Sequence, residues 1–401
     1  MTPPPGTTEA RRIALTLEWL DPSRGGLERW TWNHAGDLAA AGREVHVVAC
    51  GAEGPPPAGV RFHEAGMADS VWERARRIGR VAGSLNCDIV HDMGAGLAAD
   101  ILHPHGGSVR AWREHNLLRI PAWRRIRFFQ ERRYREQAAL QRAQLTACRV
   151  VIAVSRMTAG HLTKFDGIDP ARIRVIPNGV DCARFHPPAA DSSSDAVRRE
   201  LGIALESTLH LMVAHNLRLK NAECAIRALA IANRSGHGGR LLIVGGRKPA
   251  RQIALARKLG LAESVTFLPP LDDVVPLYQA ATTLVHPTWY DPCSLVTIEA
   301  MACGLPVITS ACNGASEMID HGVDGLVLPH PSDAHAMAGW MRELAGPARR
   351  TEVARAAREK ALARPSSHQL GAFLALYDSL AGVPTAAGAL RIPTGSSRSA
   401  A

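Results

Sequence analysis

Short runs of branched apolar residues, separated by segments of helical length, restrict the fold of this chain more than any other feature. The first half carries them at Ile13–Trp19, Glu44–Cys50, Cys87–Asp92, Asp100–His105 and Arg149–Ser155. A second series occurs at Leu209–His215, Arg240–Gly245, Ser264–Leu268, Thr282–Pro287, Pro306–Ser310 and Gly325–Leu328. Apolar strands that alternate with helices are typical of parallel sheets covered on both faces. Two such series predict an α/β protein with two Rossmann-like, doubly wound domains.

The length and the loop residues of the chain support this division, because 401 residues are long for one core. We predict an N-terminal domain over 10–180 and a C-terminal domain over 181–365, with an exposed, Pro- and Ser-rich connection at 187–195. Residues 366–381 are expected to form a helix that packs back on the first domain. The tail 382–401 is rich in Gly, Ser, Thr and Pro and is expected to be disordered.

Cysteine usage and hydropathy predict a cytoplasmic location. The eight cysteines are scattered and include no C-x-x-C pair, which favours reduced thiols over disulfides or a zinc site. No apolar run reaches the length of a membrane span. The first eight residues lack the apolar core of a secretory signal.

The formal net charge of +10 is concentrated in one segment. Residues 107–150 contain eleven arginines and three glutamates, with aromatic residues interleaved over Arg110–Arg135. Such a pattern suits peripheral contact with the anionic inner face of a membrane. A solvated helix face with inward-packing aromatics is the alternative. Nucleic acid is not expected as a partner, because no nucleic-acid-binding motif accompanies the charge.

The segment Asp291–Pro306 carries the strongest candidate site. A predicted strand ends just before it, Ser294 is a good helix-start residue, and Gly304 is a stop signal. The first amides of that helix, on Ser294, Leu295 and Val296, would form an anion site suited to a diphosphate. Asp291 and Glu299 would flank it and accept hydrogen bonds from sugar or ribose hydroxyls. The alternative is a turn-forming Asp291 and a solvent-facing Glu299.

Three further candidates lie at predicted strand ends. Arg218 and Lys220 could clamp a leaving diphosphate, or belong to an ordinary basic surface loop. Gly25–Gly26 could bring backbone amides close to a phosphate, or simply turn the chain. His103 and His105 precede a Gly-Gly pair, and one of them is expected to line the cleft between the domains.

Missing motifs exclude several other classes of enzyme. The chain has no Asp-x-Asp triplet, which argues against a metal-bound diphosphate site, and no metal or other cofactor is expected. It has no G-x-x-x-x-G-K-[ST] loop, which argues against ATP hydrolysis. It also has no G-x-S-x-G nucleophile elbow. A G-x-G-x-x-G motif after the first strand is also lacking, which weakens a dehydrogenase interpretation.

Three motifs in the second half resemble the family 4 retaining glycosyltransferases, which have the GT-B architecture. They are Val175–Asp181 (VIPNGVD), the segment Asp291–Pro306, and Asn313–Val327 with its NGASE and HGVDGLV elements, in the family's order and separations. In the first half, Arg24–Arg29 and the Arg/aromatic segment are similar to the lipopolysaccharide core glucosyltransferases of that family. The resemblance extends from about residue 11 to residue 380.

The resemblance assigns roles to individual residues. Glu299 matches the second acidic residue of the E-x7-E motif, expected on the nucleotide ribose, and Asp291 matches the first, expected on hydroxyls of the donor sugar. Arg218 and Lys220 match the diphosphate-binding basic pair. Gly26 matches the glycine of the first domain's phosphate loop, and His105 is chosen as the cleft histidine.

Two positions depart from the family pattern. The first acidic residue is Asp291 instead of Glu, which puts the identity of the donor sugar in question. The basic pair is spaced R-x-K and is followed by Asn221 instead of the common Gly, which could shift the helix start against the phosphates.

The resemblance implies transfer of a hexose, with glucose from a UDP-sugar expected, to a glycan or glycolipid such as the lipopolysaccharide core. The acceptor hydroxyl would attack from the face that the diphosphate leaves. Three alternatives stay open: a transferase with a soluble acceptor, a sugar-nucleotide epimerase, and a binding protein that never turns over.

Overall fold

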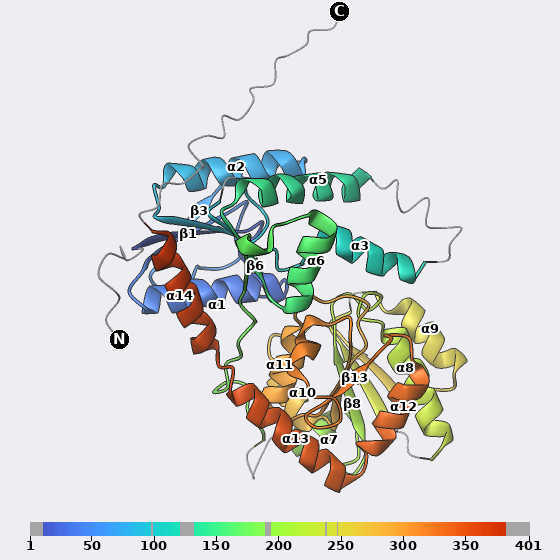
Figure 1. The fold of residues 1–401 in the computed structure, drawn as a ribbon. Helices are drawn as coiled ribbons and strands as arrows, with labels where there is room; N and C mark the ends of the chain where they lie inside the picture. The colour runs from blue at the N-terminus through green and yellow to red at the C-terminus, as the bar shows by residue number, and fades with distance from the viewer. Residues whose placement is uncertain are drawn as a thin grey trace, which may run out of the picture.

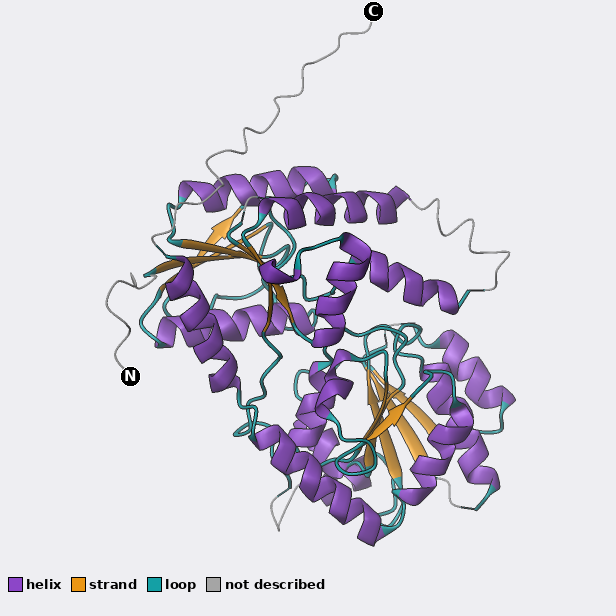
Figure 2. Ribbon diagram, viewed as in Figure 1, coloured by secondary structure: helices purple, strands orange, loops and turns teal. Residues whose placement is uncertain are grey.

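The computed structural model describes residues 11–97, 99–120, 132–188, 194–236, 239–246 and 248–381. Within them the chain forms two α/β units, each built on one parallel sheet with helices on both faces (Figures 1 and 2). The α/β class and the two Rossmann-like domains expected from the sequence are confirmed. The tail 382–401 lies outside the described residues, as does the middle of the Arg/aromatic segment, 121–131.

The first sheet has seven strands in the order β3-β2-β1-β4-β5-β6-β7. Its strands are β1 (Arg12–Thr16), β2 (Glu44–Ala49), β3 (Val60–Glu64), β4 (Ile89–Asp92), β5 (Ile101–Leu102), β6 (Val150–Ala153) and β7 (Ile173–Val175). Every pairing is parallel, with Ile13 opposite Val45 on one side of β1 and opposite Ile89 on the other. The strand order reverses between β1 and β4, so the carboxyl ends of these two strands flank a topological switch point.

The second sheet has six strands in the order β10-β9-β8-β11-β12-β13. Its strands are β8 (Leu209–Val213), β9 (Arg240–Val244), β10 (Val265–Leu268), β11 (Thr283–His286), β12 (Val307–Ser310) and β13 (Leu326–Leu328). Its switch point lies between β8 and β11. The loops after these two strands carry the basic pair and Asp291.

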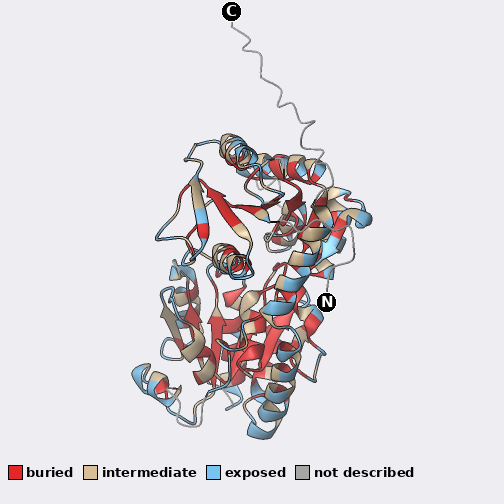
Figure 3. Ribbon diagram, turned by 90° about the vertical axis from the view of Figure 1, so that its left-hand side faces the viewer, coloured by how far each residue is buried: buried red, intermediate tan, exposed pale blue. Residues whose placement is uncertain are grey.

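Helices cover both sheets with exposed outer faces, and most strand residues are buried between them (Figure 3). Those of the first unit are α1 (Gly26–Ala40), α2 (Val71–Ser84), α3 (Val109–Leu118), α5 (Arg132–Ala147), α6 (Arg156–Asp166) and η1 (Pro170–Arg172). Those of the second are α7 (Ser194–Glu200), α8 (Ala222–Arg234), α9 (Ala250–Lys258), α10 (Val275–Ala280), α11 (Leu295–Ala302), η2 (Gly314–Met318), α12 (Ala334–Glu343) and α13 (Pro347–Leu362). None of the described helices is long and apolar enough to cross a membrane.

The final helix, α14 (Ser366–Leu380), follows the second unit in sequence but lies beside α1 of the first (Figure 1). Phe373 and Tyr377 are fully buried in the same apolar cluster as Ile13 and Leu15 of β1. Burial of two aromatic side chains contributes several kcal/mol, about 1.5–3 for each fully buried apolar side chain. The chain therefore crosses between the two units twice, near residue 180 and near residue 365.

The carboxyl edges of the two sheets face each other. Gly26, at the start of α1, lies so close to Leu295 of α11 that an added Cβ would stand 3.3 Å from Leu295 Cδ1. Gly107, after β5, has φ +72° and packs against Tyr290, where an added Cβ would stand 2.2 Å from the hydroxyl. The positive φ and the collision require glycine at 107, while the contact at Gly26 shows only a close approach. Together they place the loops after β1, β5 and β11 at one junction.

Candidate functional site

Helix α11 starts at the carboxyl edge of the second sheet. Ser294 is its N-cap residue, but its side chain makes no capping hydrogen bond. The amide of Ser294 donates instead to Asn313 Oδ1 at 3.1 Å. The amides of Leu295 and Val296 have no partner within the described part of the chain. Of the three amides expected to hold an anion, these two are thus available for one.

Asn313 fixes the loop that leads into α11. It is completely buried, and besides Ser294 it accepts a hydrogen bond from the amide of Ala315 at 3.1 Å. Its Nδ2 donates to Thr297 Oγ1 at 3.1 Å and to Thr309 Oγ1 at 3.0 Å. A buried amide with all of these bonds satisfied holds the helix start rigidly against β12. The sequence marked this residue only as part of a family motif.

Lys220 and Asp291 form an ion pair, which brings together two predicted site residues. Lys220 Nζ donates to Asp291 Oδ2, and His286 Nε2 lies 3.2 Å from the same oxygen. Despite the burial of Asp291, the charge of Lys220 and the contact with His286 hold its pKa well below the usual range. Asp291 therefore supports the lysine here. Its role at donor-sugar hydroxyls stays a prediction.

Arg218 is exposed and does not share this pair, although it precedes Lys220 by two residues. Burial and the charge of Arg218 lower the pKa of Arg119, which lies at the end of α3 in the first unit. A cation of the second sheet thus approaches the first unit across the cleft. Its role on a diphosphate stays a prediction.

The structure explains why Asn221 can stand where the family pattern commonly has Gly. This residue adopts the left-handed conformation, with φ +58° and ψ +47°, at the N-cap of α8. Gly reaches that region without cost, and Asn is among the few other residues that adopt it readily. Its Nδ2 also donates to Pro331 O at 2.7 Å, which a glycine could not do. The turn after Lys220 therefore keeps the geometry that glycine would give.

Glu299 lies one helical turn beyond the free amides and borders a cavity of about 160 Å³. Gly25 and Gly26 line the same cavity from the first unit, together with Leu295 and Val296. The hydroxyl of buried Tyr278 donates to Glu299 Oε2 at 2.9 Å. Burial raises the pKa of Glu299, and this hydrogen bond opposes the rise. Gly26 and Glu299, predicted separately, thus meet in one cavity.

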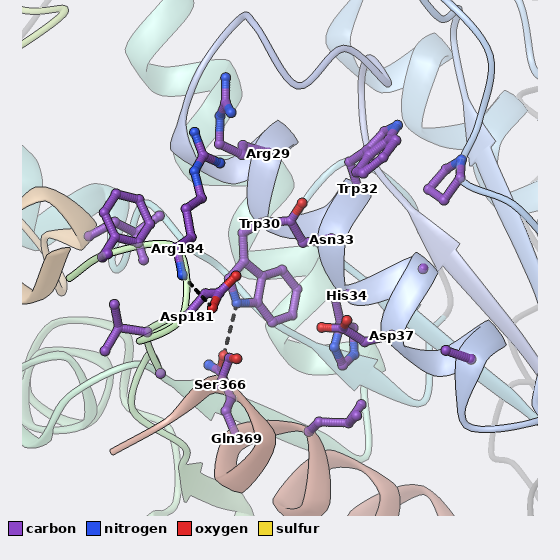
Figure 4. Close-up of a pocket in the computed structure, with 18 of the residues that line it drawn as sticks. Arg29, Trp30, Trp32, Asn33, His34, Asp37, Asp181, Arg184, Ser366 and Gln369 are labelled. Carbon is purple, nitrogen blue, oxygen red and sulfur yellow. Dashed lines mark hydrogen bonds between the residues drawn. The ribbon is translucent and has the colours of Figure 1, made fainter. Parts of the chain in front are cut away.

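Two arginines to which the sequence assigned no individual role lie beside Glu299. Arg29 of α1 and Arg184 of the segment joining the units both line the 160 Å³ cavity. Both also line a larger cavity of about 760 Å³ on its other side (Figure 4). In that larger cavity Trp30 Nε1 donates to Gln369 Oε1 of α14 at 3.2 Å. Its place at the end of the Arg24–Arg29 motif was the sequence signal for Arg29.

The two histidines after β5 differ in position. His103 is fully buried and stacks on His91 with ring centroids 5.3 Å apart. His105 is half-buried, stacks on His103 at 3.8 Å and lies 4.5 Å from the ring of Trp30. Burial lowers the pKa of both, to about 3 for His105. Neither ring is among the residues that line the cavities of about 160, 630 and 760 Å³, so the choice of His105 as the cleft histidine stays a prediction.

Part of the described Arg/aromatic segment packs against protein, whereas Arg132, Arg133 and Arg135 are exposed. Arg113 lies 4.6 Å from the ring centre of Tyr134, and Arg110 donates to Phe165 O at 2.8 Å. Trp112 lines a cavity in the first unit. Within the residues described, no group of three or more His, Cys, Asp or Glu is placed to hold a metal ion.

This architecture is the GT-B fold. The structure superimposes on that of WaaG, a glycosyltransferase involved in lipopolysaccharide biosynthesis, with a TM-score of 0.78 and 24% identity over 91% of this chain and 99% of the other. Anabaena Alr3699/HepE in complex with UDP-glucose matches with a TM-score of 0.72 and 18% identity over 92% and 99% of the two chains.

Two family models cover most of the sequence. Residues 24–184 match Glycosyltransferase Family 4, and residues 193–360 match Glycosyl transferases group 1. The chain belongs to the family 4 glycosyltransferases, as the motifs predicted. A D-inositol 3-phosphate glycosyltransferase from Acidothermus cellulolyticus is 34% identical over 258 residues, 59% of this chain. The match spans only 56% of that relative's length.

Proposed function

We propose that this chain is a retaining glycosyltransferase that moves a hexose from a nucleoside-diphosphate sugar to a hydroxyl of a glycan or glycolipid. One observation carries the proposal: Gly26, the free amides of Leu295 and Val296, and Glu299 line one cavity between the two units. A diphosphate would accept from those amides while the ribose hydroxyls donate to Glu299. UDP-glucose is the donor to test first, because HepE has been solved with that molecule.

The chemistry needs positive charge where the diphosphate leaves. The acceptor oxygen forms a bond to C1 of the hexose as the bond from C1 to the phosphate oxygen breaks. The departing oxygen takes the acceptor's proton. Arg218, Lys220 and the α11 amides would stabilise the charge that this oxygen gains. Lys220 keeps donors for a phosphate while bonded to Asp291, since an ammonium has three N–H groups. The proposal requires no metal.

Binding and slow hydrolysis of UDP-, GDP- and ADP-glucose by the purified protein test the proposal. Saturable preference for one donor, lost in Glu299→Ala but kept in Glu263→Ala, would support it. Glu263 is exposed and remote from the cavity, so it controls for loss of a carboxylate. If no nucleotide sugar binds, the proposal fails. Turnover of the donor without any acceptor into an isomeric sugar nucleotide would favour the epimerase alternative.

Peripheral attachment to the inner face of the cytoplasmic membrane is part of the proposal, with a lipid-linked acceptor such as the lipopolysaccharide core. The excess of arginine over Arg110–Arg135 supports it, at roughly 1 kcal/mol for each basic residue near an anionic surface. Changing Arg124, Arg125 and Arg127 to Gln should abolish binding to anionic liposomes. An equal charge change on exposed arginines of the second unit is the control, at Arg234, Arg257 and Arg355. Equal binding by both triple variants would refute the attachment and favour a soluble acceptor.

A further inference from the structure

A cavity of about 630 Å³ lies in the first unit, at the carboxyl ends of β1, β4 and β5. Helices α2, α3 and α5 supply the rest of its lining. We propose that this cavity binds the acceptor and selects an uncharged polyhydroxylated ring, such as a sugar, over a phosphorylated one. The inference rests on the proposed function and adds the chemical class of the acceptor.

The position of the cavity fits an acceptor. Leu27, which lines it, follows Gly26 of the donor cavity directly. Gly107, also in the lining, touches Tyr290, the residue before Asp291. A hydroxyl held here would therefore stand next to the residues proposed to hold the donor.

The glycine loop after β4 is the first place where a phosphate would be expected to bind in this cavity. Its amides are already used by the chain itself. Buried Asp92 accepts at Oδ1 from the amides of Gly94, Ala95 and Gly96, at 3.1, 2.9 and 2.9 Å. A carboxylate thus fills the concave row of N–H groups that could otherwise hold an anion.

The N-terminus of α3 is the second such place, and two of its first three amides are also used by the chain itself. Gln141 Oε1 accepts from the amide of Val109 at 2.7 Å, and Ser108 Oγ accepts from the amide of Ala111 at 3.0 Å. Both acceptors are buried, with Gln141 8% exposed and Ser108 0% exposed. Of the first three amides of α3, those of Val109 and Ala111 are therefore already used, which leaves that of Arg110 and weakens this helix start as a phosphate site.

The charged side chains of the lining oppose a second negative group. Three carboxylates line the described cavity, Glu18, Asp69 and Glu136, against the guanidiniums of Arg74 and Arg133. Arg74 already pairs with Glu18 at 3.0 Å and donates to Ala68 O at 2.7 Å.

The start of α2 has no side-chain cap, but its charged residues do not reverse the excess of carboxylates over guanidiniums in the cavity lining. Asp69 precedes that helix, and Glu73 lies in its first turn. A dianionic phosphate would therefore meet like charge, whereas sugar hydroxyls would find carboxylate acceptors. The half-buried Trp112 adds an aromatic face to the lining.

This chemistry separates the chain from relatives named for D-inositol 3-phosphate, a polyol that carries a phosphate. Identity of 34% over part of each chain does not fix the acceptor, because acceptor choice depends on a few lining side chains. The amides already used after β4 and at the start of α3, together with the acidic lining, favour the neutral class.

Matched pairs of probes test the inference: glucose against glucose 6-phosphate, and myo-inositol against D-inositol 3-phosphate. Binding is measured by saturation-transfer NMR on the intact protein, and transfer is measured with the donor that the panel selects. In at least one pair, the neutral member should bind about tenfold more tightly than the phosphorylated one. A tenfold change in affinity corresponds to about the free energy of one charge-assisted hydrogen bond. Glu136→Lys should remove or invert that preference, and the exposed, remote Glu53→Lys should leave it unchanged.

Three results would overturn the inference: tighter binding of the phosphorylated member, binding of neither member of either pair, or equal effects of Glu136→Lys and Glu53→Lys. Donor binding is measured separately in the absence of these probes. Its failure would refute the proposed function itself, whereas normal donor hydrolysis with preference for a phosphorylated probe would refute only the acceptor class.

Discussion

Glu317 of the second unit accepts a hydrogen bond at 2.5 Å from the backbone amide of Met157, in the first turn of α6 of the first unit. Its other oxygen accepts from the amide of Arg156 at 2.9 Å. Beside it, Ser155 Oγ donates to Pro292 O at 2.7 Å. A carboxylate from one unit therefore caps a helix of the other, which ties the relative position of the units to a few hydrogen bonds.

Removal of this cap should loosen the contact between the units. Glu317→Ala should lower the free energy of unfolding by about 1 kcal/mol, the usual cost of a lost helix cap. The radius of gyration measured by X-ray scattering should increase as the cleft opens. Glu359→Ala is the control, since among the described residues the Glu359 carboxylate pairs with Arg355 alone, on the exposed face of α13. An unchanged radius of gyration in Glu317→Ala would show that the cap does not hold the units together.

Substitution of Lys220 and of Arg218 should affect stability differently, because Lys220 pairs with the buried Asp291 and Arg218 does not. Lys220→Ala removes the ammonium from the buried carboxylate of Asp291 and leaves it beside His286 Nε2 at 3.2 Å, which should cost up to about 3–5 kcal/mol of stability. Arg218→Ala removes an exposed side chain and should leave the melting temperature nearly unchanged. Under the proposed function, both should reduce the rate of transfer at saturating donor. Thermal unfolding and steady-state kinetics measure the two effects, and equal melting temperatures would contradict the geometry at Asp291.

Gly107 should tolerate no side chain, whereas its neighbour Gly106 should. An alanine at 107 needs a positive φ and would collide with the Tyr290 hydroxyl, but a Cβ at 106 meets nothing within 4 Å. Gly107→Ala should therefore destabilise the protein by at least about 1 kcal/mol from the backbone alone. Thermal unfolding of both variants checks this. If the collision matters, Tyr290→Ala should partly rescue Gly107→Ala, and absence of rescue would assign the whole effect to the backbone.

The buried histidines should make the protein sensitive to acid. Tyr377 lies within hydrogen-bond distance of His34 Nε2, at 2.9 Å, and of His91 Nδ1, at 2.7 Å. Burial lowers the pKa of His34 to about 3 and that of His91 well below its usual value. The unfolded chain titrates near 6.5 and so binds more protons than the folded state below that pH. Their contribution to stability is therefore complete above pH 6.5 and is lost as the pH falls.

Urea unfolding between pH 7.5 and pH 4.5 measures this loss. The free energy of unfolding should fall by up to about 1.4 kcal/mol per pH unit for each such histidine. His34→Gln removes one titrating group and should flatten the slope, although it also lowers stability at neutral pH. His368→Gln is the control, because His368 is exposed on α14. Equal slopes in the wild type and in His34→Gln would exclude His34 as the group responsible.

The apolar runs predicted the second sheet completely, because its six strands are continuous and well separated by helices. In the first sheet, β3 and β7 were missed. The burial of β3 is incomplete, with Arg61 and Glu64 exposed, and β7 has only three residues, two of them exposed. Edge strands of this kind need only part of their surface to be apolar, so their sequences lack the pattern of a buried strand.

For the site, the sequence by itself determined which residues the family motifs mark, the turn chemistry at Gly26, and the start of α11 at Ser294. Only the tertiary structure decided their partners. It placed Lys220 on Asp291, the Tyr278 hydroxyl on Glu299, and Asn313 across the start of α11. Hydrophobic periodicity and capping are local and can be read along the chain, whereas these contacts join residues far apart in sequence. They depend on how two sheets and a returning helix pack, which no local pattern encodes.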